Sequence, residues 1–290
     1  MKLNGRREST NVDDRRGKGG KAALGGLGIG GIVIAIIMTL MGGGDMGDVV
    51  NVVTQQMTQN VTEQPADGTQ FSPEEQELAK FSKQILAGTE DVWTKEFQKM
   101  GLEYECPRLV LYTGSTQSGC GTGTAQMGPF YCSADQCVYI DLSFFMDMKK
   151  TLGADGDFAY AYVIAHEVGH HVQHLLGTLS DAHQQMSRLS EKESNKISVR
   201  LELQADFYAG VWAHHDNAMF GSLEEGDVDE AILCAQKIGD DYLQKKARGY
   251  AQPETFNHGT SAQRSKWLKR GISTGDIRQG DTFKMPYEQL

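Results

Sequence analysis

Hydrophobic side chains recur at intervals of three and four residues through most of the second half of the chain. This spacing places them on one face of an α-helix, and over residues 157–176 it predicts a helix that Gly177 ends. Earlier, residues 72–75 (Ser-Pro-Glu-Glu) have the composition of a helix N-terminus, with serine as the cap and glutamate at the third helical position. Further helical patterns cover residues 73–85, 91–100, 198–215, 227–247 and 261–270.

Two short stretches have the composition of β-strands, residues 107–112 (PRLVLY) and 138–142 (VYIDL). The residues between them, 113–136, are rich in Gly, Ser, Thr and Cys and are too many for a tight hairpin, so we predict a long loop. A few strands followed by a set of helices is typical of the α+β class. We therefore expect one α+β domain over residues 72–290, mostly helical with a small sheet.

Residues 22–44 (AALGGLGIGGIVIAIIMTLMGGG) contain no charged side chain. As a helix, such a run would be about 34 Å long, enough for the roughly 30 Å hydrocarbon core of a bilayer. A cleaved signal peptide or a buried glycine-rich helix would also contain a run of this kind. Its length, and the lack of an Ala-x-Ala-like cleavage site, favour a transmembrane anchor. The polar residues 45–71 are then a flexible linker between the membrane and the domain.

Charge is distributed unevenly along this chain, whose formal net charge is −10. Residues 1–21 contain seven Lys or Arg and three Asp or Glu, so they carry +4 and the remaining residues carry −14. An acidic chain of this kind argues against a nucleic-acid partner. By the positive-inside rule, residues 1–21 form a basic cytoplasmic tail, and everything after the single membrane span lies outside the cytoplasm.

Four of the five cysteines lie within 32 residues of one another. An oxidising location outside the membrane favours disulfides among Cys106, Cys120, Cys132 and Cys137, which allow three pairings. A second zinc site is the alternative, but spacings of 13, 11 and 4 residues do not form two paired C-x₂-C motifs. Cys234 stands in a helical pattern, where we expect a buried free thiol.

The strongest chemical signal is the H-E-x-x-H motif at residues 166–170, within an apolar helical segment. A separation of four residues is about one helical turn, so His166 and His170 project from the same face and can hold one Zn²⁺. Glu167 leaves the helix beside them, where it can reach a metal-bound water rather than the metal. Two histidines on one helix face can also arise by chance, and the decision depends on a third ligand.

A catalytic zinc ion usually has three protein ligands and one open position. Glu202 and Asp206 stand four residues apart on the next strong helical pattern, which places both carboxylates on one face. Glu202 is the candidate third ligand. Asp206 is the candidate partner for the far nitrogen of a zinc-bound histidine. The alternative, an ordinary solvated glutamate, fits poorly with the apolar neighbours of Glu202, because an unpaired buried carboxylate is costly.

The other histidines fit a metal site less well. A metzincin would need Gly at position 173 and His at position 176, where this chain has Gln173 and Leu176. His174 lies too far along the helix to share a metal with the motif, and His171 points about 100° away from His170. We expect both to be supporting or surface residues. The histidine pair at 214–215 has no spacing that connects it to the site.

Several segments resemble the bacterial neutral zinc metallopeptidase family of membrane-anchored envelope proteins: HEVGHHVQ, ELQADFYAGVW, HGTSAQRSKW and SGCG…GPFYC…VYIDLSFF. The resemblance covers roughly residues 73–283 together with the anchor. It implies a zincin-like fold, a gluzincin-type site of two His and one Glu, bound Zn²⁺, and peptidase activity on the periplasmic side of the inner membrane. It also implies an edge strand over 138–145 for an extended substrate, and a disulfide between Cys120 and Cys132, with Cys106 and Cys137 able to form a second one.

The reaction expected from these residues is peptide hydrolysis. Zinc lowers the pKa of its water to about 7, and Glu167 takes a proton from that water and returns it to the leaving amine. His258 is the candidate that stabilises the oxyanion, because a C-terminal histidine has this role in some gluzincins. A structural loop histidine is an equal alternative for His258, and Tyr208 is a weaker candidate for the same role.

Two other classes of function are compatible with the motif. The first is a non-catalytic envelope binding or scaffold protein that zinc stabilises, although a purely structural site needs no general base such as Glu167. The second is a zinc amidase that acts on a peptidoglycan peptide, because the motif determines water activation and not the substrate.

Overall fold

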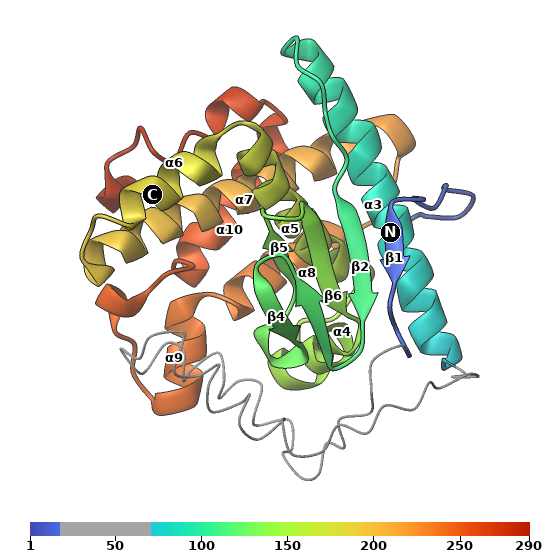
Figure 1. Ribbon diagram of the computed structural model, residues 1–290, viewed down its shortest axis with the longest axis horizontal. Helices are drawn as coiled ribbons and strands as arrows, with labels where there is room; N and C mark the ends of the chain where they lie inside the picture. Colours follow the sequence, from blue (N-terminus) through green and yellow to red (C-terminus); the bar gives the residue numbers. More distant parts are fainter. Residues whose placement is uncertain (18–70) are drawn as a thin grey trace.

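The computed structural model describes residues 1–17 and 71–290 of the protein. Within these two stretches the chain folds as the predicted α+β domain, mostly helical with one small mixed sheet (Figure 1). The transmembrane helix predicted over residues 22–44 and nearly all of the linker predicted over 45–71 lie outside the described residues. Among the helices of the described part, none has the length and apolar character that a membrane span requires.

The sheet has the strand order β1-β2-β6-β5. Its two central strands, β2 (Arg108–Tyr112) and β6 (Cys137–Asp141), are parallel, with Leu109 opposite Val138 and Leu111 opposite Ile140. These four side chains belong to the main hydrophobic core, on the face that the helices α3 (Pro73–Lys99) and α5 (Asp157–Leu175) cover. The alternate residues of both strands form a second, smaller cluster on the opposite face.

The segment predicted as a long loop contains three strands. β3 (Ser115–Ser118) and β4 (Gly121–Thr124) form a hairpin, and β5 (Phe130–Cys132) pairs antiparallel with β6. Gly and Ser in short polar strands carry little strand signal, which explains the error. The prediction of an edge strand over 138–145 is also wrong, because β6 is internal and β5 forms that edge of the sheet.

One disulfide joins Cys120, in the β3–β4 turn, to Cys132 at the end of β5, with an S–S distance of 2.04 Å. Cys106 and Cys137, which we expected could form a second bridge, are both free thiols, and Cys106 is exposed. Cys234 is a buried free thiol, as predicted. The single bridge therefore fastens the hairpin to the edge strand of the sheet.

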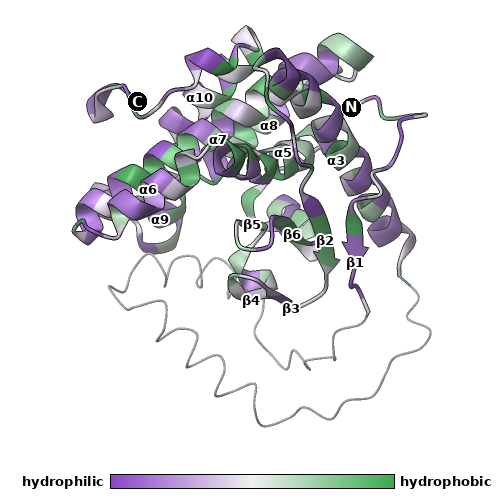
Figure 2. Ribbon diagram, turned by 45° about the horizontal axis from the view of Figure 1, so that its top comes forward, coloured by the Kyte–Doolittle hydropathy of each residue, from purple (hydrophilic) through white to green (hydrophobic). Residues whose placement is uncertain are grey.

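The largely apolar helix α5 lies at the centre of the helical layer (Figure 2). α7 and α8 pack on α5, and α10 packs on α7 and α8. Two predicted helices, 73–85 and 91–100, are one continuous helix, in which the Ser72 hydroxyl accepts the Glu75 N–H as expected. The helices are α3 (Pro73–Lys99), α4 (Ser143–Asp147), α5 (Asp157–Leu175), α6 (Thr178–Met186), α7 (Glu191–Phe220), α8 (Asp227–Lys237), α9 (Asp240–Arg248) and α10 (Ser261–Thr274). Short helical turns occur at Ala125–Met127, Met148–Leu152, Pro253–Thr255, Ile277–Gln279 and Tyr287–Gln289.

The helix predicted over 227–247 is divided into α8 and α9. Gly239 between them is extended, and the Asp240 N–H donates to the carbonyl of Gly259 instead of continuing the helix. A Cβ atom on Gly239 would lie 2.4 Å from the Ser261 nitrogen, so only glycine permits this approach to the start of α10. The break directs the Asp240 side chain toward the loop before α10.

The N-terminal residues are folded against the domain. Strand β1 (Val12–Asp14) pairs in parallel with β2, and residues before it lie along α3 (Figure 1). The sequence predicts a basic cytoplasmic tail over residues 1–21, outside the folded domain. The structure instead makes residues 1–17 part of the sheet and its surroundings.

Candidate metal centre

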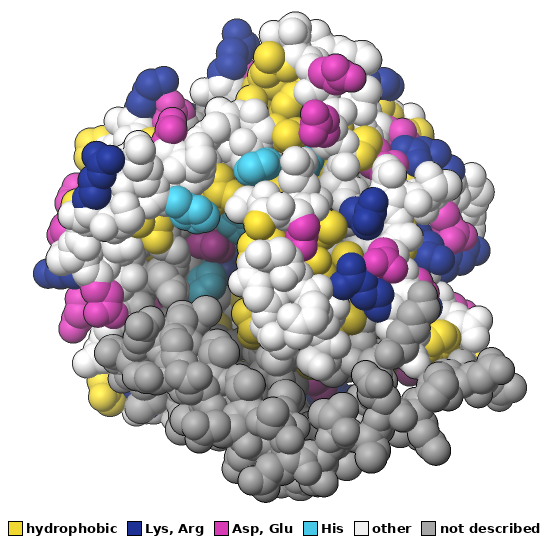
Figure 3. Space-filling model, in the orientation of Figure 1, with side chains coloured by type: hydrophobic (Ala, Val, Ile, Leu, Met, Phe, Trp, Pro, Cys, Tyr) yellow, Lys and Arg dark blue, Asp and Glu magenta, His cyan; other side chains and the backbone are white. Residues whose placement is uncertain are grey.

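The candidate site lies where α5 and α7 come close together. Gly169, inside the H-E-x-x-H motif, faces the backbone of Ala205 on α7, and a Cβ atom there would lie 2.9 Å from the Ala205 carbonyl oxygen. This close contact brings Glu202 and Asp206 of α7 beside His166 and His170 of α5. Histidine and acidic side chains line the hollow on this face of the molecule (Figure 3).

His166, His170 and Glu202 each direct one ligand atom to a common point, and these atoms all lie within 4.8 Å of one another. The Nε2 atom of His166 is 3.1 Å from one Glu202 oxygen, and Nε2 of His170 is 3.4 Å from the other. Ligands bound to one tetrahedral zinc at 2.0–2.2 Å are separated by about 3.3–3.5 Å. Within residues 1–17 and 71–290, this is the one group of three or more such side chains that could hold a metal ion.

The far nitrogen of each histidine has its own acceptor. Nδ1 of His166 is 2.8 Å from Oδ1 of Asp206, and Nδ1 of His170 is 2.9 Å from Oε1 of Gln173. When both Nδ1 atoms donate to these acceptors, both Nε2 lone pairs face the metal position, which is the tautomer that zinc needs. The prediction for Asp206 thus agrees with its position. The partnership of Gln173 with His170 was missed, although its spacing of three residues on the same helix was the available signal.

Asp206 is itself fixed by two buried side chains that the sequence did not reveal. Arg264 of α10 donates to both Asp206 oxygens at 2.9 Å, and the Tyr162 hydroxyl donates to Oδ1 at 2.5 Å. Asp206 and Tyr162 are almost completely buried, and Arg264 is 3% exposed. α10 reaches this position because Gly271 packs directly on α7, where a Cβ atom would lie 2.1 Å from the Phe207 carbonyl oxygen.

The charges in the site stabilise one another. Burial opposes a charge on His166, but the carboxylates of Asp206 and Glu202 outweigh it and raise the His166 pKa to about 10. Burial likewise opposes the charge on Asp206, yet Arg264 and His166 keep the pKa of Asp206 below its usual value. A cation must compete with protons for the histidine nitrogens, so we expect its affinity to increase with pH.

Glu167 and His258 lie near the metal group without belonging to it. Glu167 is 8% exposed. Burial opposes a charge on His170, but Glu202 and, to a smaller extent, Glu167 raise the His170 pKa. Nδ1 of His258 is 3.1 Å from Oδ1 of buried Asp240, while Oδ2 of Asp240 accepts the His258 N–H at 2.7 Å. Partial burial opposes a charge on His258, whose side chain is 41% exposed, but Asp240 and then Glu202 raise its pKa. The role of Asp240 was not predicted, because it depends on the break between α8 and α9.

The remaining histidines have structural positions. His171 is buried, donates from Nε2 to the Glu105 carbonyl at 2.6 Å, and accepts the Tyr131 hydroxyl of β5 at Nδ1, at 2.9 Å. Burial lowers the His171 pKa to about 4, so the ring is neutral. The pair at 214–215 contacts carbonyl groups at the C-terminal end of α10, which explains these two residues without the metal site.

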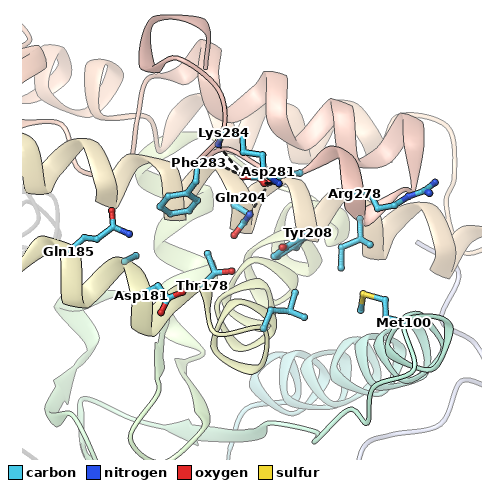
Figure 4. Close-up of a pocket in the computed structure, with 14 residues that line it drawn as sticks. Met100, Thr178, Asp181, Gln185, Gln204, Tyr208, Arg278, Asp281, Phe283 and Lys284 are labelled. Carbon is cyan, nitrogen blue, oxygen red and sulfur yellow. Dashed lines mark hydrogen bonds and ion pairs between the residues drawn. The ribbon is translucent and has the colours of Figure 1, made fainter.

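A separate hollow of about 550 Å³ lies between α6, α7 and the segment after α10 (Figure 4). Tyr208, the weaker candidate for the oxyanion donor, lines this hollow, so its side chain is turned away from the metal group. Gln204 also lines it, and it accepts a hydrogen bond from Gln173 and donates one to the Gly280 carbonyl. The hollow is therefore connected to the metal centre by the Gln204–Gln173–His170 series of hydrogen bonds.

We expect replacement of Gln173 by methionine to weaken zinc binding by about 10- to 100-fold, because the His170 ring loses the acceptor that orients it. Gln173→Glu keeps that acceptor but loses the donor to the Leu201 carbonyl, so it should reduce stability and keep most of the zinc affinity. Competition with a chelating dye gives the affinity, and thermal unfolding gives the stability. Equal zinc affinity in Gln173→Met and the wild type would show that the contact does not orient the ligand.

A sequence profile described as "Putative neutral zinc metallopeptidase" matches residues 1–283. The chain belongs to this family. The uncharacterized protein YpfJ of Escherichia coli K12 is 50% identical over 291 residues, which cover 98% of this chain and 99% of that protein. The uncharacterized protein Rv2575 of Mycobacterium tuberculosis H37Rv is 40% identical over 190 residues, 62% of this chain and 63% of that protein. No solved structure matches the chain. The family match includes residues 1–17 as well as the metal centre.

Proposed function

We propose that this member of the neutral zinc metallopeptidase family is an active peptidase, with one zinc ion held by His166, His170 and Glu202. The observation that supports this best is the combination of a two-histidine, one-carboxylate ligand group with Glu167 beside it. Three protein ligands leave a tetrahedral zinc one open position, as catalytic sites require. A structural zinc site would be closed by a fourth ligand and would have no use for a general base.

Zinc, when bound, supplies a water of pKa near 7 and a positive charge beside the scissile carbonyl. In the proposed reaction, Glu167 accepts the proton of the attacking water and then transfers it to the leaving amine. Asp206 and Gln173 hold the two histidine rings in the tautomer that faces the metal position. His258, held by Asp240, donates to the oxyanion as it develops.

The edge strand β5 is the proposed place for an extended peptide. It lies beside α5, and the Tyr131 hydroxyl connects it to His171, the residue after the second histidine of the motif. A peptide that adds to the free edge of β5 would pass the metal centre. Two alternatives were predicted from the sequence. A zinc-stabilised scaffold would bind zinc and release no product. An amidase acting on a peptidoglycan peptide would release fragments of peptidoglycan and not of protein.

The test is metal analysis of the purified full chain together with cleavage of a peptide library and of peptidoglycan fragments. The proposal expects about one zinc per chain and new amino termini in the peptide library. Stoichiometric zinc without cleavage of any peptide would favour the scaffold. Cleavage confined to peptidoglycan fragments would favour the amidase.

Replacement of His258 by alanine should lower kcat by about 10²-fold, because one donor to the oxyanion is lost, with little change in KM or zinc content. Asp240→Asn should change kcat in the same direction by a smaller factor, since the asparagine oxygen can still accept the backbone N–H groups of the loop. Steady-state kinetics on a cleaved peptide measures both effects. A lower Tm with unchanged kcat would show that His258 has a structural role only.

A further inference from the structure

The N-terminal segment, residues 1–17, adds a strand to the domain that contains the metal centre. β1 aligns Val12 with Leu109 and Asp14 with Leu111 of β2. Main-chain hydrogen bonds before and after this strand continue the contact, because the Ser9 N–H donates to Lys83 of α3 at 3.0 Å and the Arg15 N–H donates to Leu111 at 2.8 Å. The segment is therefore bound along its length and not at one point.

Two buried carboxylates of the domain obtain their cationic partners from this segment. Arg6 donates to both oxygens of Asp216, at 2.8 and 3.3 Å, and the Asp216 side chain is 2% exposed. Arg7 is 2.9 Å from Glu90, whose side chain is 7% exposed and which also accepts the Ser9 hydroxyl at 2.5 Å. A buried carboxylate without a cation is strongly destabilising. Asp216 and Glu90 are therefore expected to be stable as buried carboxylates when the N-terminal segment is bound.

Gly88 is a third position in the domain that fits the bound segment. It lies in the interior of α3, where glycine weakens a helix relative to alanine. A Cβ atom on Gly88 would lie 2.8 Å from Oδ1 of Asp216 and 2.9 Å from Nη2 of Arg6. The glycine makes room for the Arg6–Asp216 ion pair against the helix.

The end of the N-terminal segment lies beside the residues at which the described chain resumes. The Arg16 guanidinium lies 4.3 Å from the centre of the Phe71 ring, and it donates to the Glu75 carbonyl at 3.2 Å. If residues 22–44 crossed a bilayer once, residues 17 and 71 would be separated by its hydrocarbon core of roughly 30 Å. The bound segment and the single-span arrangement therefore exclude each other.

Four of the seven basic residues that predicted a cytoplasmic N-terminus are paired within the fold. Arg6 and Arg7 contact carboxylates of α7 and α3, and Arg15 and Arg16 contact Asp13 and Asp14 of β1. Their charges are thus accounted for by local partners, and the orientation that the positive-inside rule suggests has a competing explanation.

We propose that residues 1–17 are a permanent part of the folded domain and lie on the same side of the membrane as the metal centre. The partner of the surface formed by α3, β2 and the end of α7 is the chain's own N-terminus. The single-pass orientation, in which the N-terminus lies in the cytoplasm and the domain outside it, is thereby given up. This placement is independent of whether the protein cleaves peptides.

Labelling with a membrane-impermeant maleimide tests the sidedness of the full chain in intact spheroplasts. In a Cys106→Ser background the remaining thiols are bridged or buried, so Glu8→Cys and Glu103→Cys, both at exposed positions, report the segment and the domain separately. The proposal expects the two variants to behave alike, both labelled before lysis or both only after it. Labelling of one before lysis and of the other only after lysis would overturn it.

A double-mutant cycle on the purified full chain tests the binding of the segment. Arg6→Met should lower Tm by about 5 °C or more, because Asp216 then stays buried without a cation. The Arg6→Met/Asp216→Asn double variant should lose less than the sum of the two single variants. Arg278→Met, at a side chain that is 86% exposed, is the matched control and should change Tm by no more than about 1 °C. An unchanged Tm in Arg6→Met, or strict additivity in the cycle, would contradict the proposal.

Discussion

Replacing Glu167 by glutamine is expected to lower kcat by about 10²- to 10⁴-fold while zinc remains bound. Glutamine has nearly the same size as glutamate, but it cannot accept a proton from the attacking water. Zinc should stay because the ligand group consists of His166, His170 and Glu202 and does not include Glu167. The measurements are kcat on a cleaved peptide and zinc per chain by elemental analysis.

The same substitution at Glu202 is the matched control. Glu202→Gln removes a charged ligand from the metal group, so it should lose zinc as well as activity. The two variants together separate proton transfer from metal binding. If Glu167→Gln hydrolysed peptides at the wild-type rate, the proposed role of Glu167 as general base would be wrong.

Replacing Arg264 by methionine should lower the free energy of unfolding by about 3–5 kcal/mol, because it leaves the buried Asp206 carboxylate without its cation. It should also weaken zinc binding, since Asp206 is the acceptor that orients His166. We therefore expect a loss of zinc affinity together with a loss of stability, from a residue that does not contact the metal. Chemical denaturation and a zinc competition assay measure the two effects.

Lys269→Met provides the comparison for Arg264→Met. It also removes a cation from α10, but at an exposed position, so it should change stability by less than about 0.5 kcal/mol and leave zinc affinity unaltered. Tyr162→Phe should have an effect between the two, because it removes only one of the hydrogen bonds to Asp206. A stable Arg264→Met variant with full zinc affinity would show that the ion pair does not support the site.

The sequence predicted the parts of the site that depend on helical spacing. His166 and His170 are one turn apart on α5, and Glu202 and Asp206 are one turn apart on α7, so each pair shares a face whatever the rest of the fold does. Glycine at position 169 then allows the two helices to come close, but a sequence does not state which residues such a glycine faces. The fold class followed from the same periodicity together with the two stretches of strand composition that precede most of the helices.

The parts that the sequence did not predict depend on long-range contacts. Arg264 is 58 residues from Asp206 in the sequence, and nothing in the local pattern of α10 distinguishes it from a solvated arginine. Asp240 acts on His258 only because Gly239 ends α8. The short strands of 113–136 have few of the side chains that favour strands, and the hairpin is held by its turn and its disulfide.

His171 follows the second histidine of the motif, and its burial makes the stability of the fold depend on pH. With a pKa of about 4 in the fold and about 6.5 in an unfolded chain, this ring binds a proton only in the unfolded chain between these two values. Its contribution to stability is therefore present above about pH 6.5 and is lost as the pH falls toward 4. Since the same ring holds Tyr131 of β5, falling pH should loosen the attachment of β5, the strand proposed to receive the peptide, to α5.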